Sequence, residues 1–459
     1  MLKQNSDLRN SIYDGIFANM FATLTGGVFL TGFAIQLGMN EFMIGLLGSM
    51  PFIATLFQLP ASYFIWKNGR RKKVAFFGAF FTRIIWIPIT IIAFLPLIDI
   101  MTRLYLILTL IFFSYSFASV SHIAWLSWTS ELVPDGMRGR FFGTRNMLCG
   151  AAGMIVMIIF GQFLDHFKYI SLGILPIPFY ITFFSAILFG ILSLNFLKKI
   201  TEPLKNVQPY ESSDFKMLIS QPLSDSNFKK YLIFAFFWGF SVHFASPFFT
   251  LYFLRELSFS YGFVAVLGVL STSADLTGML VWGRLSDIVK NKAVIRFAGW
   301  IVVFIPLAWA IIHPTNVVIP MVLQLISGFF WSGINLCTNN LLLRISQHDN
   351  KPFFLSVFNI IGGLGAATSP IIAGFFLNKL VNMDIRLFNL NLLPIQFIFI
   401  TSTFLRLISF QILRSVNEPE EMPAFEIVRI IRGLRGLNVA SGFNSFLHPF
   451  IAFEKENKD

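Results

Sequence analysis

The connector GRLSDIVKNK at 283–292 lies between two long apolar runs, and a weaker copy of it, SYFIWKNGRR at 62–71, lies between two others. A connector that occurs twice indicates a chain built from two related halves. In membrane proteins with such repeats, the functional site lies where the halves meet. We therefore expect two bundles of helices with a shared site between them.

The composition is that of a membrane protein. Hydrophobic residues make up 55% of the chain and charged residues 13%, and the mean hydropathy is +0.70. A helix needs roughly 20 apolar residues to span a bilayer. Runs close to or above that length occur at 15–37, 42–66, 74–95, 103–130, 144–167, 171–197, 230–254, 260–283, 294–312, 316–343, 353–378 and 388–413. The sequence predicts an all-α polytopic protein with twelve transmembrane helices in two pseudo-symmetric six-helix bundles.

An internal repeat supports this division. At an offset of 213 residues, similar residues coincide in two of the apolar runs: Arg138 with Lys351, Asn146 with Asn359, Gly150 with Gly363, and Gly161 with Gly374. Six helices repeated in the same orientation are expected when an even number of spans separates the copies. We expect a first bundle at 1–197, a cytoplasmic linker at 198–229, a second bundle at 230–413 and a cytoplasmic tail at 414–459.

The tail contains AFEIVRIIRGLRGL at 424–437, in which apolar and basic residues fall on different helical faces. Such a helix suits the inner membrane surface. Packing on the protein's own cytoplasmic loops is an equal alternative.

The basic residues predict the orientation. If the N-terminus is cytoplasmic, the inner segments hold 28 of the 35 Lys and Arg residues, and the outer loops hold five. This bias predicts that both termini are cytoplasmic. The net charge of +12 then reflects topology, so we expect no nucleic-acid partner.

Three loops carry recognisable motifs. The connector at 283–292 has a G-x-x-x-D pattern followed by basic residues, formed by Gly283, Arg284, Ser286, Asp287, Lys290 and Lys292. The copy keeps Gly69, Arg70 and Arg71 but has Ser62 and Trp66 in place of the first Gly and the Asp. A third loop has the pattern P-x-x-x-R-G-x-x-x-G, formed by Pro134, Arg138, Gly139 and Gly143. Together with the predicted spans, these motifs resemble the major facilitator superfamily over almost the whole chain.

The resemblance implies that Asp287 faces the start of the helix at 138–145 in one arrangement of the bundles. A carboxylate is stabilised by the positive N-terminal end of a helix. A contact available in only one arrangement can latch it. The alternative is that the connector is only a tight, positive-inside turn. Because Trp66 cannot accept a hydrogen bond as Asp does, we expect the first-half latch to be absent or altered.

Ionisable residues inside the bilayer are costly and usually functional. Asp275 lies eight residues before Gly283, or about 12 Å inside the helix end. It could load a proton on one side and release it on the other, or serve as packing held by a nearby polar group. His122 and His243 also approach the middle of the membrane, on helices that the resemblance places around a central cavity. They are candidate substrate or proton ligands, with satisfied interior residues as the alternative.

Aromatic and amide side chains complete the candidate site. Trp125 lies on the fourth helix, and Asn335 and Asn339 lie one turn apart on the tenth. Aromatic walls with amide hydrogen bonds suit an organic solute better than a bare ion. Arg83 and Arg406 lie within helices that the resemblance makes peripheral, so they are either ligands for an anion or structural counter-charges.

Motifs of soluble catalytic sites are missing from the sequence, including a Gly-rich phosphate loop, a His pair at metal-ligand spacing and a nucleophile elbow. We expect no enzyme, cofactor or metal site. The expected function is secondary active transport of a small organic solute by alternating access, with proton coupling as an option. The alternatives are a lipid or lysolipid flippase and a non-transporting membrane receptor. We expect a monomer in a bacterial inner membrane, with a small-molecule substrate, the lipid bilayer and protons as partners.

Overall fold

The computed structural model describes residues 2–94, 99–134, 137–172, 175–202, 222–312, 316–346, 351–381, 385–387, 390–419 and 421–422. Within this part of the chain, twelve helical stretches are long and apolar enough to cross a membrane. They are Ser6–Gln36, Glu41–Ile65, Arg71–Ala93, Ile100–Thr129, Arg138–His166, Ile177–Lys199, Ser226–Glu256, Tyr261–Val289, Asn291–Ala310, Val318–Ile345, Phe354–Leu380 and Pro394–Arg414. The predicted fold class is confirmed. Most of the predicted linker and the helix predicted at 424–437 lie outside the described residues.

The first bundle contains spans one to six. Its elements are α1 (Leu2–Leu24), α2 (Gly27–Gln36), α3 (Glu41–Ala54), the 3-10 turn η1 (Thr55–Phe57), α4 (Gln58–Asn68), α5 (Arg71–Ile84), α6 (Trp86–Phe94), α7 (Ile100–Leu132), α8 (Arg138–His166), β1 (Ser171–Leu172), β2 (Leu175–Pro176) and α9 (Ile177–Lys199).

The second bundle contains spans seven to twelve. Its elements are α11 (Ser226–His243), α12 (Ser246–Leu251), the π-helical turn η3 (Tyr252–Glu256), α13 (Tyr261–Val289), α14 (Asn291–Ala310), α15 (Val318–Ile345), α16 (Lys351–Leu380), β3 (Ile385–Leu387), β4 (Leu390–Leu392) and α17 (Pro394–Arg414).

The same helix pairings recur in the two bundles. In the first, α1 packs on α8 and α9, and α5 packs on α7. In the second, α11 packs on α16 and α17, and α14 packs on α15. The fifth and sixth spans of each half therefore cover its first span, and the third covers its fourth. This recurrence agrees with the sequence repeat.

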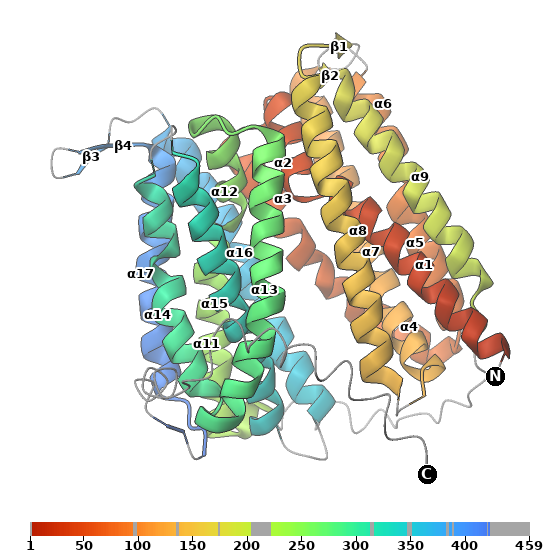
Figure 1. Cartoon of the computed structure of the whole chain (residues 1–459), viewed down its shortest axis with the longest axis vertical. Coiled ribbons are helices and arrows are strands. Elements are labelled where there is room, and N and C mark those ends of the chain that lie inside the picture. Colours follow the sequence, from red (N-terminus) through yellow and green to blue (C-terminus); the bar gives the residue numbers. More distant parts are fainter. Residues whose placement is uncertain are drawn as a thin grey trace, which may run out of the picture.

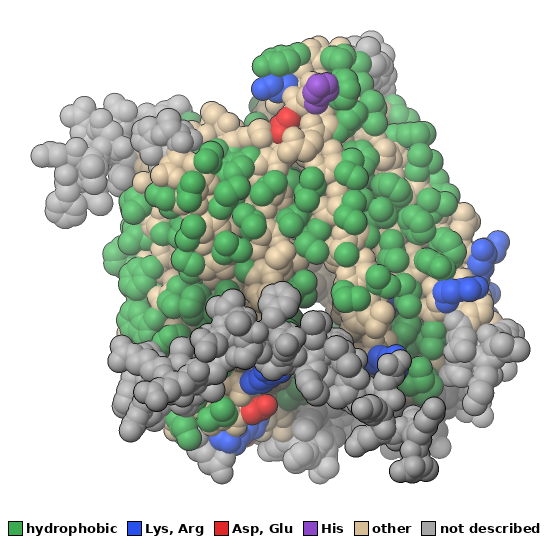
Figure 2. All heavy atoms as spheres, viewed as in Figure 1, with side chains coloured by type: hydrophobic (Ala, Val, Ile, Leu, Met, Phe, Trp, Pro, Cys, Tyr) green, Lys and Arg blue, Asp and Glu red, His purple; other side chains and the backbone are tan. Residues whose placement is uncertain are grey.

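The two bundles meet at one end of the molecule and diverge toward the other (Figure 1). We call the first the hairpin end, because the short antiparallel pairs β1–β2 and β3–β4 lie there. We call the second the basic end; there α4 is joined to α5, α7 to α8 and α13 to α14. Near the hairpin end, α3 packs against α16 and α8 against α13. Hydrophobic side chains are spread over the sides of the described spans in Figure 2, with few charged side chains among them, as expected for a surface in contact with lipid.

Glycines allow the bundles to approach closely at the hairpin end. A Cβ atom on Gly45 of α3 would lie 2.2 Å from the carbonyl oxygen of Pro370 on α16. A Cβ atom on Gly161 of α8 would lie 3.1 Å from the Cα of Gly262 on α13. Helix backbones this close require residues without side chains.

The first helix of each bundle is interrupted at a corresponding place. In the first bundle, α1 gives way to α2 at Gly26 and Gly27, and Gly27 has a φ of +50°. In the second, α11 ends at His243, and Pro247 follows in the first turn of α12. Because proline has no N–H group, the carbonyl of His243 loses the helical donor four residues ahead. Such breaks inside a membrane are tolerated where the backbone lies next to a cavity.

Candidate functional site

A cavity of about 680 Å³ lies between the two bundles. It is lined from the first bundle by α3, η1, α4 and α7, and from the second by α11, α15 and α16. Its lining extends from Phe52 and His243, deep in the spans, to Ser62 and Ser356, toward the basic end. The bundles are in contact at the hairpin end, so the cavity reaches into the membrane from the basic end.

The walls of the cavity are aromatic and amide-rich. The described residues that line it are Phe52, Thr55, Leu56, Gln58, Leu59, Ser62, Ile123, Phe234, Ala235, Trp238, Gly239, Val242, His243, Trp331, Ile334, Asn335, Thr338, Asn339, Ser356, Phe358, Asn359, Ile360, Gly362, Gly363 and Ala366. None of these lining residues is Asp, Glu, Lys or Arg. The site is therefore built for hydrogen bonding and ring stacking.

Three of the candidates from the sequence come together in this cavity: His243, Asn335 and Asn339. The His243 ring packs across the bundle interface against Phe52, with 4.2 Å between ring centroids. The Asn339 amide donates to the carbonyl of Asn335 at 3.0 Å, while Asn335 presents an exposed side chain. His243 closes the deep end of the cavity, and the asparagines line its wall.

Trp125 and His122 lie on α7 beside the cavity lining rather than in it. The guanidinium carbon of Arg145 lies 4.2 Å from the Trp125 ring centroid. The His122 ring is 6.5 Å from that of Trp125. His122 is exposed one residue before Ile123, which does line the cavity. Trp125 therefore makes a cation–π contact with Arg145 at the edge of the site, and His122 lies against the Trp125 ring.

Arg83 is buried within the first bundle and does not line the cavity. Its guanidinium donates to the hydroxyl of Ser193 at 2.7 Å and to the carbonyl of Ala79 at 2.8 Å. Ser193 in turn donates to the carboxylate of Asp14 at 2.5 Å. This chain ties α1, α5 and α9 together, so the geometry favours the structural counter-charge over the anion ligand. Asp14, on α1, is the balancing acid.

Asp275 lies half-exposed on α13 and outside the cavity lining. It makes no hydrogen bond or ion pair with any described residue. It follows Gly268 by two helical turns on the same face, and Gly268 packs on Met157 of α8. Asp275 therefore continues the seam between α8 and α13 toward the basic end, where the bundles separate.

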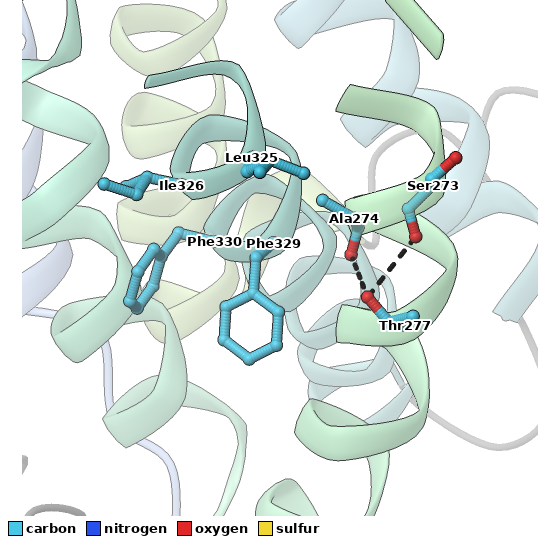
Figure 3. A pocket seen from close by; sticks show the side chains of 7 residues that line it. All are labelled: Ser273, Ala274, Thr277, Leu325, Ile326, Phe329 and Phe330. Atoms are coloured by element: carbon cyan, nitrogen blue, oxygen red, sulfur yellow. Dashed lines mark hydrogen bonds between the residues drawn. The ribbon is translucent and has the colours of Figure 1, made fainter. Parts of the chain in front are cut away.

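A separate apolar groove of about 490 Å³ lies between α13 and α15 (Figure 3). Ser273, Ala274 and Thr277 form one side, and Leu325, Ile326, Phe329 and Phe330 form the other. The Thr277 hydroxyl bonds to the carbonyls of Ala274 at 2.9 Å and Ser273 at 3.3 Å. This groove lies within the second bundle, carries no charged lining residue and shares no lining residue with the central cavity. We interpret it as membrane-facing surface.

The loop motifs occupy helix ends at the basic end. Gly69 ends α4 with a left-handed φ of +64°, and Arg70 precedes the first residue of α5, Arg71. Pro134, Arg138, Gly139, Gly143 and Arg284 are all exposed around the ends of α7, α8 and α13. Gly283 has space for a side chain, because its nearest contact beyond α13 would be Leu336 at 3.7 Å.

Asp287 is exposed at the basic end of α13, where it lines a hollow of about 410 Å³ with Arg344 and Lys290. It makes no hydrogen bond or ion pair with the described part of the chain, which includes 138–145. The Nε of Arg138 donates instead to the carbonyl of Val133 at 3.3 Å. The latch on Asp287 remains a prediction for the arrangement in which the basic end is closed.

Sequence reasoning missed the carboxylates that join the bundles at the hairpin end. Asp165, in the last turn of α8, accepts the backbone N–H groups of Tyr261 and Gly262, at 2.8 and 2.7 Å, at the start of α13. Glu41 pairs with Arg255 across the same interface at 2.7 Å. A carboxylate in the last turn of a helix is unfavourable, because the C-terminal end of the helix dipole is also negative. An acid at such a position therefore indicates a stabilising partner on another element.

Two further carboxylates bond helix starts at the basic end. Glu202, after the sixth span, accepts the N–H of Lys72 at 3.0 Å. Glu418, after the twelfth, accepts the N–H groups of Asn291 at 3.3 Å and Lys292 at 2.6 Å. Both acids stand in a short repeat, TEP at 201–203 and NEP at 417–419. That repeat was the available sequence signal.

Comparison with known proteins agrees with this architecture. The family model described as "Major Facilitator Superfamily" matches residues 15–370 and 231–444. No curated protein matches the chain. A mutant of the nucleoside transporter NupG superposes with a TM-score of 0.67 at 12% identity, covering 91% of this chain and 100% of that one.

Two other solved transporters are similarly close. A bacterial homologue of the iron transporter ferroportin, in an inward-facing state, has a TM-score of 0.66 at 11% identity, covering 91% of this chain and 99% of its own. A bacterial homologue of the human lysosomal transporter Spinster, in an inward-facing, unoccupied conformation, has a TM-score of 0.64 at 12% identity with the same coverage. At these identities the similarity shows the fold alone. The family match spans well over half of the chain, and twelve spans enclose a central cavity, so the chain belongs to the major facilitator superfamily of solute transporters.

Proposed function

We propose that this chain is a secondary active transporter that moves a small organic solute by alternating access. The observation that carries the proposal is the cavity between the bundles, shut at the hairpin end by cross-bundle contacts and extending toward the basic end. Rocking of one bundle against the other would expose the same walls at the hairpin end. The family match and the transporter folds of the structural neighbours support this mechanism.

The Lys and Arg bias supports a cytoplasmic basic end. The described chain begins and ends there, with α1 starting and α17 finishing at that side. With this orientation, the structure corresponds to an inward-open state. Maleimide labelling of single cysteines from each side of sealed vesicles tests it.

Cross-linking tests alternating access directly. We replace Glu41 and Arg255 by cysteine in a background without Cys149 and Cys337, and join the new pair with a short bis-maleimide, which adds to both thiols. The cross-link should stop solute counterflow in proteoliposomes and leave binding from the basic end intact. Each single-cysteine variant serves as the control. Counterflow that continues with the hairpin end held shut would contradict the proposal, and binding without any transport would favour a receptor.

Proton coupling through Asp275 is the finer part of the proposal. Its carboxylate has no described partner and lies on the seam that opens between the bundles, so it can exchange protons when the seam is hydrated. Asp275→Asn should abolish stimulation of uptake by a pH gradient while leaving counterflow measurable. Uptake that stays equally pH-driven in this variant removes the coupling role.

A flippase would need a lateral opening in which charged and apolar residues meet. The groove in Figure 3 is apolar and lies within one bundle, so it does not support that function.

A further inference from the structure

A buried positive charge lies directly behind the wall of the central cavity. Arg406, on α17, is 2% exposed, and its guanidinium donates to the carbonyl of Val302 at 2.9 Å. Its guanidinium carbon lies 5.7 Å from the ring centroid of Trp331, a residue that lines the cavity. The Arg406 Nε has no hydrogen-bond partner among the described residues. Arginine does not give up its proton in proteins, so this charge is permanent.

No described carboxylate balances Arg406. The ion pairs among the described residues all involve other cations. Arg83, the other arginine deep within a span, differs because Ser193 links it to the Asp14 carboxylate. A buried charge without a partner is strongly unfavourable. The second bundle therefore holds a positive charge that the described protein groups leave uncompensated.

The cavity wall in front of this charge is rich in N–H donors. Trp238 and Trp331 lie side by side, with ring centroids 5.7 Å apart. Their indole N–H groups, and the amides of Asn335 and Asn359, make no hydrogen bond within the described part of the protein. His243 lies at the deep end of the same cavity. With no acid among the described lining residues, a cation would meet repulsion here and an anion would meet attraction.

We propose that the central cavity accepts an organic anion and that Arg406 supplies its counter-charge from behind Trp331. This inference rests on the proposed function of the cavity as the substrate site. A soluble, ring-bearing carboxylate or phosphate ester matches the chemistry best. Its ring would lie against Trp238 and Trp331, and its anionic group would bond the free N–H groups. Anion binding would offset the cost of burying Arg406.

Collisional quenching of tryptophan tests the charge without knowledge of the substrate. The fluorescence of Trp331 is obtained as the difference between the emission of the purified full-length protein and that of its Trp331→Phe variant. We call this difference the cavity signal. We expect iodide to quench this signal more strongly than caesium, with neutral acrylamide as the reference for access. The iodide-to-caesium ratio is the quenching constant of iodide divided by that of caesium. Arg406→Gln should lower this ratio by about ten-fold, which is the effect of one partly screened charge about 10 Å away. Arg406→Lys should retain the ratio.

Arg414→Gln is the matched control, because Arg414 is exposed at the end of the same helix. It changes the net charge equally and should leave the ratio unchanged. Arg406→Gln should fold, since it removes a buried charge that no described carboxylate balances. An iodide-to-caesium ratio of one or less in the unaltered protein overturns the proposal, whatever the variants do. A ratio that Arg406→Gln does not change overturns it as well.

Binding of matched compounds separates this inference from the proposed function. Nicotinate should raise the melting temperature more than nicotinamide, and 3-(aminomethyl)pyridine should give no shift. Lysophosphatidylglycerol in place of nicotinate distinguishes a lipid anion from a soluble one. Preference for the amide or the amine contradicts the anion site but leaves transport open. Anion binding without counterflow contradicts transport but leaves the anion site standing.

Discussion

The two ends of the bundle interface use carboxylates in opposite ways. At the hairpin end, Asp165 bonds the start of a helix in the other bundle, and Glu41 pairs with Arg255 across the interface. At the basic end, Glu202 and Glu418 bond helix starts within their own bundles. Acids at the hairpin end therefore join the bundles to each other, and those at the basic end hold each bundle together.

This difference separates two properties that a transporter needs. Contacts between the bundles set the equilibrium between open and closed arrangements. Contacts within a bundle set its stability and should persist in every arrangement. Substitutions of Asp165, Glu41 or Arg255 should shift access with little effect on folding, whereas substitutions of Glu202 or Glu418 should do the reverse.

Glu418→Ala should have the largest effect, on stability. The Glu418 side chain is completely buried at the Arg344 contact, and it bonds the starting turn of α14 as well. Removing one member of such a buried network costs about 3–5 kcal/mol. We expect a large fall in the melting temperature of the detergent-purified protein. Labelling of a cysteine at Phe42, on the face of α3 that meets α16, should stay unchanged at temperatures where the variant is folded.

Glu202→Ala is the matched variant in the first bundle. The described bond from Glu202 is to one backbone N–H, that of Lys72, and its side chain is half-buried. Its loss should cost about 1 kcal/mol. Equal destabilisation by the two variants would show that the second bundle depends on Glu418 no more than the first bundle depends on Glu202.

Gly45→Ala should have the largest effect on access. Its new Cβ would meet the Pro370 carbonyl at 2.2 Å, and neither backbone can yield easily in a packed helix pair. Overpacking of this kind costs about 1–3 kcal/mol, and only the arrangement with a closed hairpin end bears that cost. Labelling of Phe42→Cys by an impermeant maleimide should increase, and counterflow should fall. Gly150→Ala, where a Cβ has open space, should change neither.

The fold was predictable because apolar length and repeat are read directly from composition. Every predicted span overlaps a helix, and the repeat at 138 and 351 marks the starts of α8 and α16. The breaks in the first helix of each bundle were not predicted, although Gly26, Gly27 and Pro247 mark them. Breakers inside a long apolar run are ambiguous, because neighbouring helices often keep such a helix continuous.

The candidate site was only partly predictable. Depth along a helix follows from residue spacing and pointed to His243, and the amide side chains pointed to Asn335 and Asn339. All three line the central cavity, and their role as ligands stays a prediction. The side of a helix on which a residue lies depends on neighbours distant in sequence. For that reason the sequence left Arg83 open between an anion ligand and a structural counter-charge. The bond from Asp165 to Gly262 joins residues in different halves, and no repeat or spacing encodes it.

Asp165→Ala should shift access to a smaller degree than Gly45→Ala. It removes two hydrogen bonds to a charged acceptor at the start of α13, which is worth about 2 kcal/mol in total at this partly hydrated end. The carboxylate also opposes the dipole of its own helix, so the first bundle should not lose stability. We expect more labelling of Phe42→Cys and an unchanged melting temperature. Asn378→Ala, at the position equivalent to Asp165 in the repeat, should alter neither.

Asp287→Asn should have the smallest effect in the arrangement seen here, because Asp287 has no described partner in it. The latch that the family resemblance implies would form only when the basic end is closed. In that arrangement the Asp287 carboxylate would face the start of α8. Loss of that contact should favour the open basic end, so cysteine at Asn335 should label faster from that side and Phe42→Cys more slowly from the other. Under transport conditions the shift should be larger than at rest, since turnover populates the closed state. Unchanged labelling at both positions during turnover would show that the connector at 283–292 is only a turn between two helices and does not act as a latch. The carboxylates would then govern access at the hairpin end alone.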